Sequence, residues 1–267
     1  MTPQTPRPAY RGFIFDLDGT LYRGERAVPG ATEALAALRQ RGLGTVFVSN
    51  NPLEQGEAYA AKLTGLGIPT RADEVVTSAG VLAAHLGQHF PGATLFLIGE
   101  APLGELMERA GFRLTDRPEE VDVVVAALDR AFDYDKWNIA FQAIRRGARF
   151  VATNADRTLP IEGGEVPDCA GIIAALESST GRRVELVAGK PSKLIAEAAL
   201  RRLGLPPSEV LVVGDRLETD ILMGLQAGTG TALVLTGATT RAELGASEIR
   251  PGHVLETVGE VVRLAAS

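Results

Sequence analysis

Short apolar runs alternate with helix-forming stretches along most of the 267-residue chain. The runs consist mostly of apolar residues, and the run at 45–48 is β-branched and aromatic, which is typical of buried strands. The runs are 13–15, 45–48, 95–98, 121–126, 150–152, 210–213 and 232–235. This alternation predicts parallel sheets built from strand–helix–strand units. The expected fold class is therefore α/β, with a three-layer, Rossmann-like core around a parallel sheet.

Helix boundaries can also be expected near the first two strands. Leucines and alanines recur at helical spacing over 31–41, and Gly42 follows as a C-terminal cap. Pro52 stands where the first residue of a second helix would lie, with Asn51 as its N-cap.

Polar residues follow several of the predicted strands, at the point where each strand ends. They are Asp16 and Asp18 after the first run, Ser49 and Asn50 after the second, and Asp215 and Asp220 after 210–213, with Lys190 after the turn 188–189. In open α/β sheets, ligands bind outside the carboxyl ends of the strands. We therefore expect these side chains to converge at one edge of a sheet.

Two of the carboxylates are spaced to face one site. Residues two apart on an extended segment point the same way, so Asp16 and Asp18 face the site while Leu17 packs into the core. Gly19 lets the backbone turn sharply and lets a ligand approach its amides. Asp215 adds a third carboxylate, and a cluster of carboxylates with room for a phosphate suits Mg²⁺.

Two further residues supply groups that suit phosphate oxygens, namely the hydroxyl of Ser49 and the positive charge of Lys190. Taken singly, each motif has a structural interpretation, because Asp-x-Asp-Gly and Gly-Asp occur in turns and Ser-Asn-Asn caps helices. The ordered set, with each member after its own segment, favours a site for a metal ion and a phosphate.

Composition excludes several other classes of protein. Cys169 is the only cysteine, which excludes an intrachain disulfide framework and fits the reducing cytoplasm. The formal net charge of −6 argues against a partner that is a nucleic acid or a membrane surface. No apolar run approaches the ~20 residues that a membrane helix needs.

Six segments together resemble a known family. They are DLDGTLYRG at 16–24, SNN at 49–51, GARFVATNAD at 147–156, AGIIAALESSTGRR at 170–183, GKP at 189–191 and GDRLETDI at 214–221. The chain resembles the haloacid dehalogenase (HAD)-like hydrolase superfamily over nearly its whole length. More narrowly, it is similar to subfamily IIA, which has a large α/β cap of the C2 type and includes 4-nitrophenyl phosphatase, phosphoglycolate phosphatase and NagD-like phosphatases.

The resemblance implies a role for each residue of the site. Asp16 would be the nucleophile that forms an aspartyl-phosphate, and Asp18 would be the general acid and base. Mg²⁺ would be held by the Asp16 carboxylate, the Asp18 backbone carbonyl and Asp215. The phosphoryl group would be bound by Ser49, Asn50, Lys190 and the backbone amides after Asp16, including that of Gly19. Asp220 would orient Lys190 or a water on the metal.

The stretch from the SNN motif at 49–51 to the GKP motif at 189–191 is far longer than a single strand–helix–strand crossover needs. We therefore expect a cap domain at 79–185, inserted into a discontinuous core of 1–78 and 186–267. Asn154 and Asp156 follow the strand at 150–152, and we hypothesise that they help to select the leaving group. The alternative is a loop stabilised by its own side-chain bonds to the backbone.

The sequence thus predicts a Mg²⁺-dependent cytoplasmic phosphatase that acts on a small phosphorylated metabolite. A phosphotransferase or phosphomutase on the same scaffold and a non-catalytic phosphate-binding protein are the alternatives. The intact pair of Asp16 and Asp18 argues against a pure binding role. Resemblance to the family also allows a homodimer formed through the cap, although no sequence feature decides between monomer and dimer.

Overall fold

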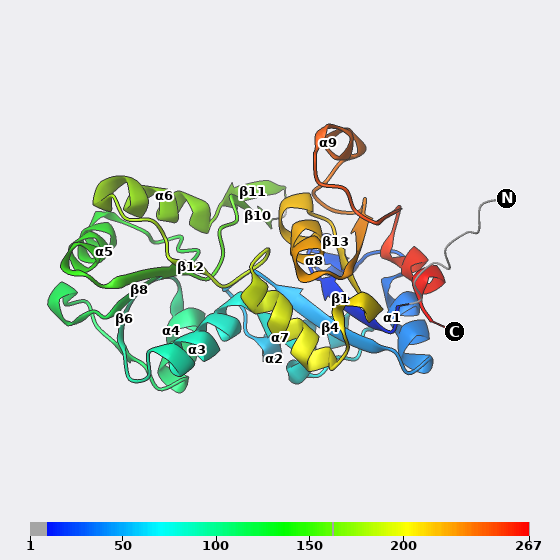
Figure 1. Ribbon diagram of the computed structural model, residues 1–267, viewed down its shortest axis with the longest axis horizontal. Helices are drawn as coiled ribbons and strands as arrows, with labels where there is room; N and C mark the ends of the chain where they lie inside the picture. Colours follow the sequence, from blue (N-terminus) through cyan, green and yellow to red (C-terminus); the bar gives the residue numbers. More distant parts are fainter. Residues whose placement is uncertain (1–9, 162, 267) are drawn as a thin grey trace. The chain divides into compact units, whose positions relative to one another are not determined.

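The computed structural model describes residues 10–161 and 163–266, which divide into two compact units (Figure 1). The first unit contains the described residues up to Val48, residues 56–76 and the described residues from Lys190 onward. The second contains residues 49–55 and 77–189. The second unit therefore includes a short segment, 49–55, that the sequence assigned to the core. The boundaries of functional domains at 79 and 185 stay a prediction.

The first unit is built on a six-stranded sheet in the order β15-β14-β13-β1-β4-β5. Strand β1 pairs in parallel with β4 on one side and with β13 on the other, and Phe15 lies opposite both Phe47 and Val213. Strands β4 and β5 follow on one side of β1, and the later strands β13, β14 and β15 lie on its other side. The carboxyl end of β1 is therefore a topological switch point, which is where open α/β sheets bind ligands.

The strands and helices of this unit follow the alternation expected from the sequence. The strands are β1 (Gly12–Asp16), β2 (Tyr22–Arg23), β3 (Arg26–Ala27), β4 (Gly44–Ser49), β5 (Val75–Thr77, of which the last residue belongs to the second unit), β13 (Val210–Gly214), β14 (Gly230–Val234) and β15 (His253–Leu255). The α-helices are α1 (Ala31–Gln40), α2 (Gly56–Gly65), α7 (Lys193–Leu203), α8 (Leu222–Ala227) and α9 (Arg241–Ala246). Shorter helical turns are η1 (Ala72–Glu74), η3 (Pro207–Glu209), η4 (Leu217–Ile221) and η5 (Val258–Leu264).

Helices cover both faces of the six-stranded sheet. On one face, Phe13, Phe15 and Phe47 form a core with buried residues of α1, α2 and η5. On the other face, Gly224 of α8 packs against Val212, and α7 lies over the same face (Figure 1). The three-layer α/β fold expected from the sequence is therefore confirmed.

The second unit has its own five-stranded sheet, in the order β12-β9-β8-β6-β7, and each of its four strand pairings is parallel. Its strands are β6 (Thr94–Ile98), β7 (Arg113–Leu114), β8 (Val123–Ala126), β9 (Arg149–Ala152), β12 (Leu186–Val187) and the antiparallel pair β10 (Thr158–Ile161) and β11 (Gly164–Pro167). Its helices are α3 (Ser78–His89), α4 (Ala101–Arg109), α5 (Tyr134–Arg146), α6 (Cys169–Thr180) and the turn η2 (Pro118–Glu120).

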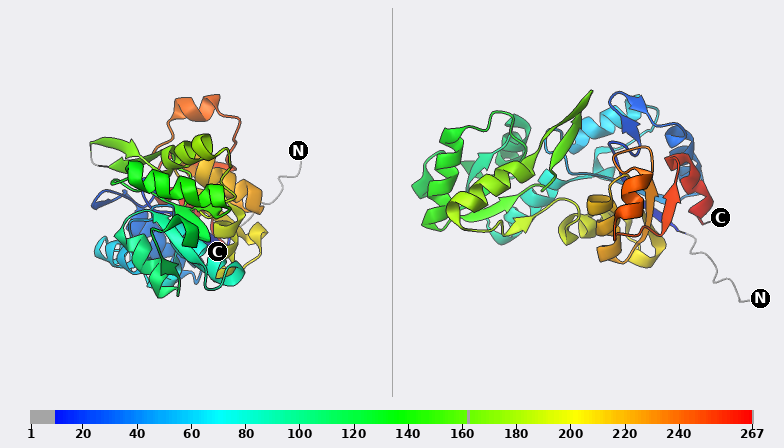
Figure 2. Two further views of the ribbon diagram at one scale, coloured as in Figure 1. Left: turned by 90° about the vertical axis from the view of Figure 1, so that its left-hand side faces the viewer. Right: turned by 90° about the horizontal axis from the view of Figure 1, so that it is seen from above.

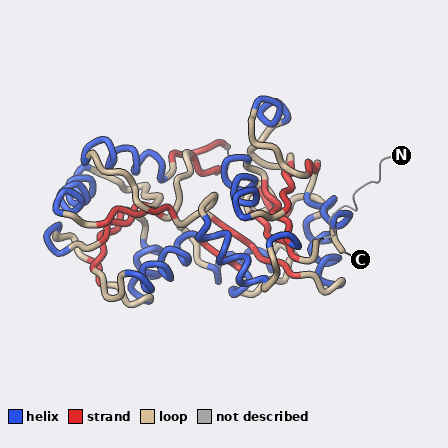
Figure 3. The backbone as a smooth tube through the Cα atoms, in the orientation of Figure 1, coloured by secondary structure: helices blue, strands red, loops and turns tan. Residues whose placement is uncertain are grey.

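Two separate hydrophobic cores cover the faces of this second sheet. Helices α5 and α6 pack on one face through Ile144 and Leu176, and α3 and α4 pack on the other through Leu86 and Met107. Figure 2 shows the two helix layers, and Figure 3 shows the strands between them. Helices on both faces require strands that are apolar on both sides, as the residues 95–98, 123–126 and 150–152 are.

One helix begins later than the sequence predicts. Asn51 does not cap a helix that starts at Pro52, because α2 begins at Gly56. The Asn51 side chain instead accepts a hydrogen bond from the amide of Leu53 at 2.9 Å. This is an Asx turn, which competes with a helix N-terminus for the same side-chain oxygen.

None of the helices in the described residues has both the length and the apolar composition needed to span a bilayer.

Candidate active site

The switch point of the first unit carries a cluster of three carboxylates. Asp16 is the last residue of β1, Asp215 directly follows β13, and Asp220 lies in the helical turn η4 that comes next. One oxygen from each of the three side chains lies within 4.8 Å of the others. All three positions were predicted from the sequence as site residues, and the structure brings them together.

Lys190 provides the positive charge of this cluster. Its ammonium Nζ donates to Asp16 Oδ1 at 2.5 Å and to Asp220 Oδ1 at 2.6 Å. The Asp220 carboxylate also accepts the backbone amide of Arg216 at 3.0 Å, which fixes its orientation. Asp220 was predicted to orient either Lys190 or a water on the metal, and the contact with Lys190 is the one that the structure contains. Gly214 makes this contact feasible, because a Cβ there would lie 2.3 Å from the Asp220 side chain.

Asp215 is held by the loop that follows β14. Its Oδ2 accepts the backbone amide of Ala238 at 2.6 Å, and its own carbonyl accepts the amide of Thr239 at 3.1 Å. Gly19 and Gly237 pack so closely on the carboxylate that a Cβ on either would overlap Asp215 Oδ2. Ala238 contributes through its backbone, and no side-chain pattern in the sequence could have revealed that contact.

The backbone of Gly19 has a φ of 85°, a region that favours glycine. Its amide donates to the carbonyl of Tyr22 at 2.8 Å. The structure thus shows the tight turn expected at Gly19, and in addition close packing of this residue against Asp215. The contact between its amide and a phosphate stays a prediction.

Burial makes the charges of this cluster unfavourable unless a cation compensates them. Burial raises the pKa of Asp16 well above its usual value; Lys190 opposes the shift, and Asp220 and Asp215 add to it. Burial and Asp220 likewise raise the pKa of Asp215, to about 6. Burial would by itself lower the pKa of Lys190, but Asp16 and Asp220 outweigh it and the pKa is raised.

Three carboxylates and one lysine leave an excess of negative charge at the cluster. Buried carboxylates without enough compensating charge are costly, and hard divalent cations prefer oxygen ligands of this type. The residues present therefore fit a divalent metal ion. Asp16 and Asp215 are the carboxylates expected to hold it, and Asp220, which the sequence places as an orienting residue, lies in the same cluster.

Asp18 lies beside this cluster and has a partner that the sequence analysis missed. The hydroxyl of Tyr22 donates to Asp18 Oδ2 at 3.1 Å. Burial raises the pKa of Asp18, whereas the Tyr22 hydrogen bond and the charge of Lys62 act in the opposite direction. Leu17, between the two aspartates, is buried in the core as predicted. The sequence feature that could have indicated this contact is the presence of a tyrosine in the DLDGTLYRG motif at 16–24, close to Asp18.

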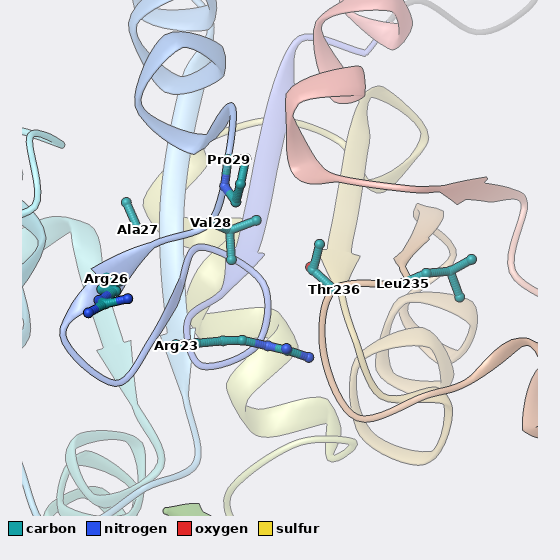
Figure 4. Close-up of a pocket in the computed structure, with 7 residues that line it drawn as sticks. All are labelled: Arg23, Arg26, Ala27, Val28, Pro29, Leu235 and Thr236. Carbon is teal, nitrogen blue, oxygen red and sulfur yellow. The ribbon is translucent and has the colours of Figure 1, made fainter. Parts of the chain in front are cut away.

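A cavity of about 330 Å³ opens between the β2–β3 hairpin and the end of β14. Its lining includes Arg23, Arg26, Val28, Leu235 and Thr236, and Figure 4 shows Arg23 extending from the hairpin toward Thr236. The Arg23 guanidinium donates to the carbonyl of Gly237 at 3.2 Å. The hairpin is thus attached to the same loop that holds Asp215.

The remaining predicted phosphate ligands belong to the second unit. Ser49 ends β4 and is buried, and its Oγ accepts the backbone amide of Asn51 at 3.2 Å. The backbone carbonyl of Asn50 accepts the hydroxyl of Ser78 at 2.8 Å. Gly189 packs against the Asn50 side chain, where a Cβ would lie 2.5 Å from Oδ1.

Asn154 and Asp156 lie in one hydrogen-bonded network with Asn50. Asp156 Oδ2 accepts both the Asn50 amide and the Asn154 amide at 2.8 Å. The Asn154 amide also donates to Asp168 Oδ2 at 3.2 Å, and Asn154 is fully buried. Selection of the leaving group by this pair stays a prediction. The structure shows that both side chains bond to other side chains and not to the local backbone.

Two models of haloacid dehalogenase-like hydrolases match the chain. The sequence model of the haloacid dehalogenase-like hydrolases matches residues 13–113, and a second HAD-like hydrolase model matches residues 187–261. The chain is 40% identical to the sugar-phosphatase AraL of Bacillus subtilis (strain 168) over 264 residues, which are 99% of this chain and 95% of that protein.

Two further matches extend over almost the whole chain. The 5'-nucleotidase YutF of Bacillus subtilis (strain 168) is 37% identical over 94% of this chain and 97% of its own length. Among solved structures, the 4-nitrophenylphosphatase of Thermotoga maritima superimposes with a TM-score of 0.90 at 35% identity and covers 95% of this chain and 97% of that one.

Proposed function

Because the chain belongs to the haloacid dehalogenase-like hydrolases, we propose that it is a Mg²⁺-dependent phosphatase that acts through Asp16. Phosphoric monoester hydrolysis is the activity that the names of its relatives share. The substrate is a small phosphorylated metabolite. Sugar phosphates are the first class to test, because AraL is named a sugar-phosphatase.

The contact between Lys190 and Asp16 carries this proposal. A largely buried carboxylate at a switch point, paired with a lysine at 2.5 Å, combines a nucleophile with a charge that binds phosphoryl oxygens. Phosphate monoesters hydrolyse very slowly without a catalyst, so an enzyme needs both a covalent route and electrostatic stabilisation. This cluster has the residue types for both.

The reaction proceeds in two stages on this chain's own residues. The Asp16 carboxylate attacks phosphorus, the bond to the leaving oxygen breaks, and Asp18 gives its proton to that oxygen. Asp18 then takes a proton from a water molecule that attacks the aspartyl-phosphate. The bond between phosphorus and Asp16 breaks, inorganic phosphate leaves, and both aspartates return to their initial states.

Lys190 stabilises the charge of the phosphoryl group, together with Ser49 and Asn50. Mg²⁺ would be held by Asp16, the backbone carbonyl of Asp18 and Asp215, and when bound it would neutralise charge on the phosphoryl oxygens and on the carboxylates. The single cysteine and the acidic composition are compatible with a cytoplasmic enzyme.

Release of inorganic phosphate from a panel of esters tests this function. The panel contains sugar phosphates, nucleoside monophosphates, phosphoglycolate and 4-nitrophenyl phosphate, each with Mg²⁺ or with a chelator. We expect release that requires Mg²⁺ and is restored when the metal is added back. Transfer of phosphate to an added alcohol in preference to water would instead identify a phosphotransferase. Binding of esters without any turnover would identify a binding protein.

The pH dependence of stability provides a second test, through Asp215. Between the usual value of 3.8 and its raised pKa of about 6, the folded chain keeps a proton that the unfolded chain has lost. The unfolded state then binds fewer protons, so this group lowers the free energy of unfolding as the pH rises through that interval. Above the interval the carboxylate is charged, and a divalent cation that binds only the folded chain stabilises it.

Thermal unfolding with and without Mg²⁺, at about pH 5 and about pH 7.5, measures this effect. We expect the increase in midpoint caused by Mg²⁺ to be larger at the higher pH. In Asp215→Asn the Mg²⁺-dependent increase should be lost at both pH values. An equal increase at both pH values in the wild type would contradict the assignment of Asp215 as a metal ligand.

A further inference from the structure

Tyr22 is fixed in place by both its backbone and its side chain. Its carbonyl accepts the amide of Gly19 at 2.8 Å, and its amide donates to the carbonyl of Leu17 at 3.3 Å. The side chain is 1% exposed, and its hydroxyl donates to Asp18 Oδ2 at 3.1 Å. The backbone bonds reach the residues on both sides of Asp18, so the ring and the carboxyl group share one rigid turn.

Two basic side chains, Lys62 and Arg23, further restrict the position of Tyr22 and of the β2–β3 hairpin. The Lys62 ammonium of α2 lies 4.3 Å from the centre of the Tyr22 ring and 3.3 Å from Glu25 Oε1, in the turn of the same hairpin. On the next residue, Arg23 donates to the carbonyl of Gly237 across the cavity shown in Figure 4. A cation over an aromatic face is stabilising, and it also restricts rotation of the ring.

We propose that Tyr22 is a positioning residue for proton transfer by Asp18, held in place by Lys62. This inference rests on the proposed function, in which Asp18 protonates the leaving oxygen. A carboxylic acid that accepts a hydrogen bond at Oδ2 carries its own proton on Oδ1. The Tyr22 hydroxyl therefore determines both the orientation of the Asp18 carboxyl group and the oxygen that donates the proton.

During the first stage the proton on Asp18 Oδ1 passes to the leaving oxygen as the bond from that oxygen to phosphorus breaks. Asp18 becomes a carboxylate, and the Tyr22 hydrogen bond to Oδ2 becomes charge-assisted and stronger. Tyr22 keeps its own proton throughout. Its hydroxyl thus stabilises the charge that develops on Asp18, and the benefit depends on how much the leaving group needs protonation.

A purely structural explanation is available, because a buried tyrosine hydroxyl generally requires a hydrogen-bond partner. The two explanations differ in their dependence on the leaving group. A sugar alkoxide is a poor leaving group and needs the proton from Asp18, whereas 4-nitrophenolate leaves without one. Loss of a positioning contact should therefore affect sugar phosphates selectively, and loss of stability alone should affect both esters alike.

The experiment compares kcat/KM for a sugar phosphate and for 4-nitrophenyl phosphate in Tyr22→Phe and the wild type. General acid catalysis is worth about 10² to 10⁴-fold, so we expect Tyr22→Phe to lower kcat/KM about 10- to 100-fold for the sugar phosphate. For 4-nitrophenyl phosphate we expect a decrease of less than about threefold, because that leaving group needs little protonation. Lys62→Met keeps the Tyr22 hydroxyl but removes the cation over its ring. We expect it to lower kcat/KM for the sugar phosphate about two- to fivefold, with a smaller effect on 4-nitrophenyl phosphate.

Two matched controls accompany these variants. Tyr10→Phe removes a buried tyrosine hydroxyl before the amino end of β1, and Arg26→Gln removes a charge from the same hairpin. Neither should change the ratio of the two kcat/KM values. Asp18→Asn shows the full effect of losing the acid and should be more selective against the sugar phosphate than Tyr22→Phe.

The outcomes separate failure of this inference from failure of the proposed function. A selective loss in Tyr22→Phe supports the inference. An equal loss on both esters, or no loss on the sugar phosphate, overturns it when Asp18→Asn is itself selective. If Asp18→Asn affects both esters equally, Asp18 is not the acid, and the proposed mechanism fails together with the inference.

Discussion

Replacing Asp16 by asparagine is expected to lower the rate of phosphate release by about 10⁴-fold or more, the scale seen when a catalytic nucleophile is removed. The amide has nearly the shape of the carboxylate but lacks its nucleophilic charge. The effect should therefore be on chemistry and not on folding. Removing the Asp16 charge also relieves its repulsion from Asp215 and Asp220. This gain in the free energy of unfolding compensates for the loss of the ion pair with Lys190.

The measurement is phosphate release from a sugar phosphate and from 4-nitrophenyl phosphate, with thermal unfolding as the check on folding. Asp73→Asn is the matched control, because this carboxylate of the same unit is exposed. Wild type stopped with acid during turnover should retain labelled phosphate on the protein, and Asp16→Asn should retain none. Substantial release by a folded Asp16→Asn variant would show that another group is the nucleophile.

Replacing Lys190 by methionine is expected to affect both stability and activity. The side chains of Lys190 and Asp220 are 5% and 1% exposed, so the substitution leaves a buried carboxylate at Asp220 and a partly buried one at Asp16 without their cation. Breaking a buried ion pair on one side costs about 3–5 kcal/mol of unfolding free energy. Loss of a charge that stabilises the reacting group should also lower kcat about 10² to 10³-fold.

Chemical denaturation and steady-state kinetics measure the two effects, and Lys193→Met is the control, because Lys193 is an exposed lysine at the start of α7. A second variant, Lys190→Met with Asp220→Asn, removes one of the uncompensated charges and should recover part of the stability but not the activity. If Lys190→Met unfolds at the same denaturant concentration as the wild type, the pairing with Asp16 and Asp220 contributes little to the folded state.

Short-range patterns predicted most of the fold correctly. The runs at 13–15, 45–48 and 210–213 became β1, β4 and β13 within a residue at each end. A buried strand must be apolar on both faces, and this requirement is visible in any single sequence. The helix expected at Pro52 failed for a local reason, because Asn51 can form an Asx turn as readily as a helix cap.

The part of the candidate site that consists of polar residues placed directly after strands could be predicted from the sequence. Asp16, Asp215, Asp220 and Lys190 were all named from the sequence, and the structure brings them together. The partners that orient Asp215 and Asp18 were not predictable. Ala238 contacts Asp215 through its backbone, and Tyr22 reaches Asp18 through a turn whose conformation depends on Gly19.

The sequence by itself determined the α/β class, because the alternation of apolar runs and helical stretches is a local pattern. It also predicted an inserted domain and the residues that we propose to carry the chemistry, from the order and spacing of the motifs. Only the tertiary structure decided that Asp220 bonds to Lys190 and that Asn154 is buried in a network with Asp156 and Asp168. It also decided that 49–55 groups with the inserted unit. These features depend on contacts between residues distant in sequence, and such contacts arise only when packing selects one arrangement among many that the local patterns allow.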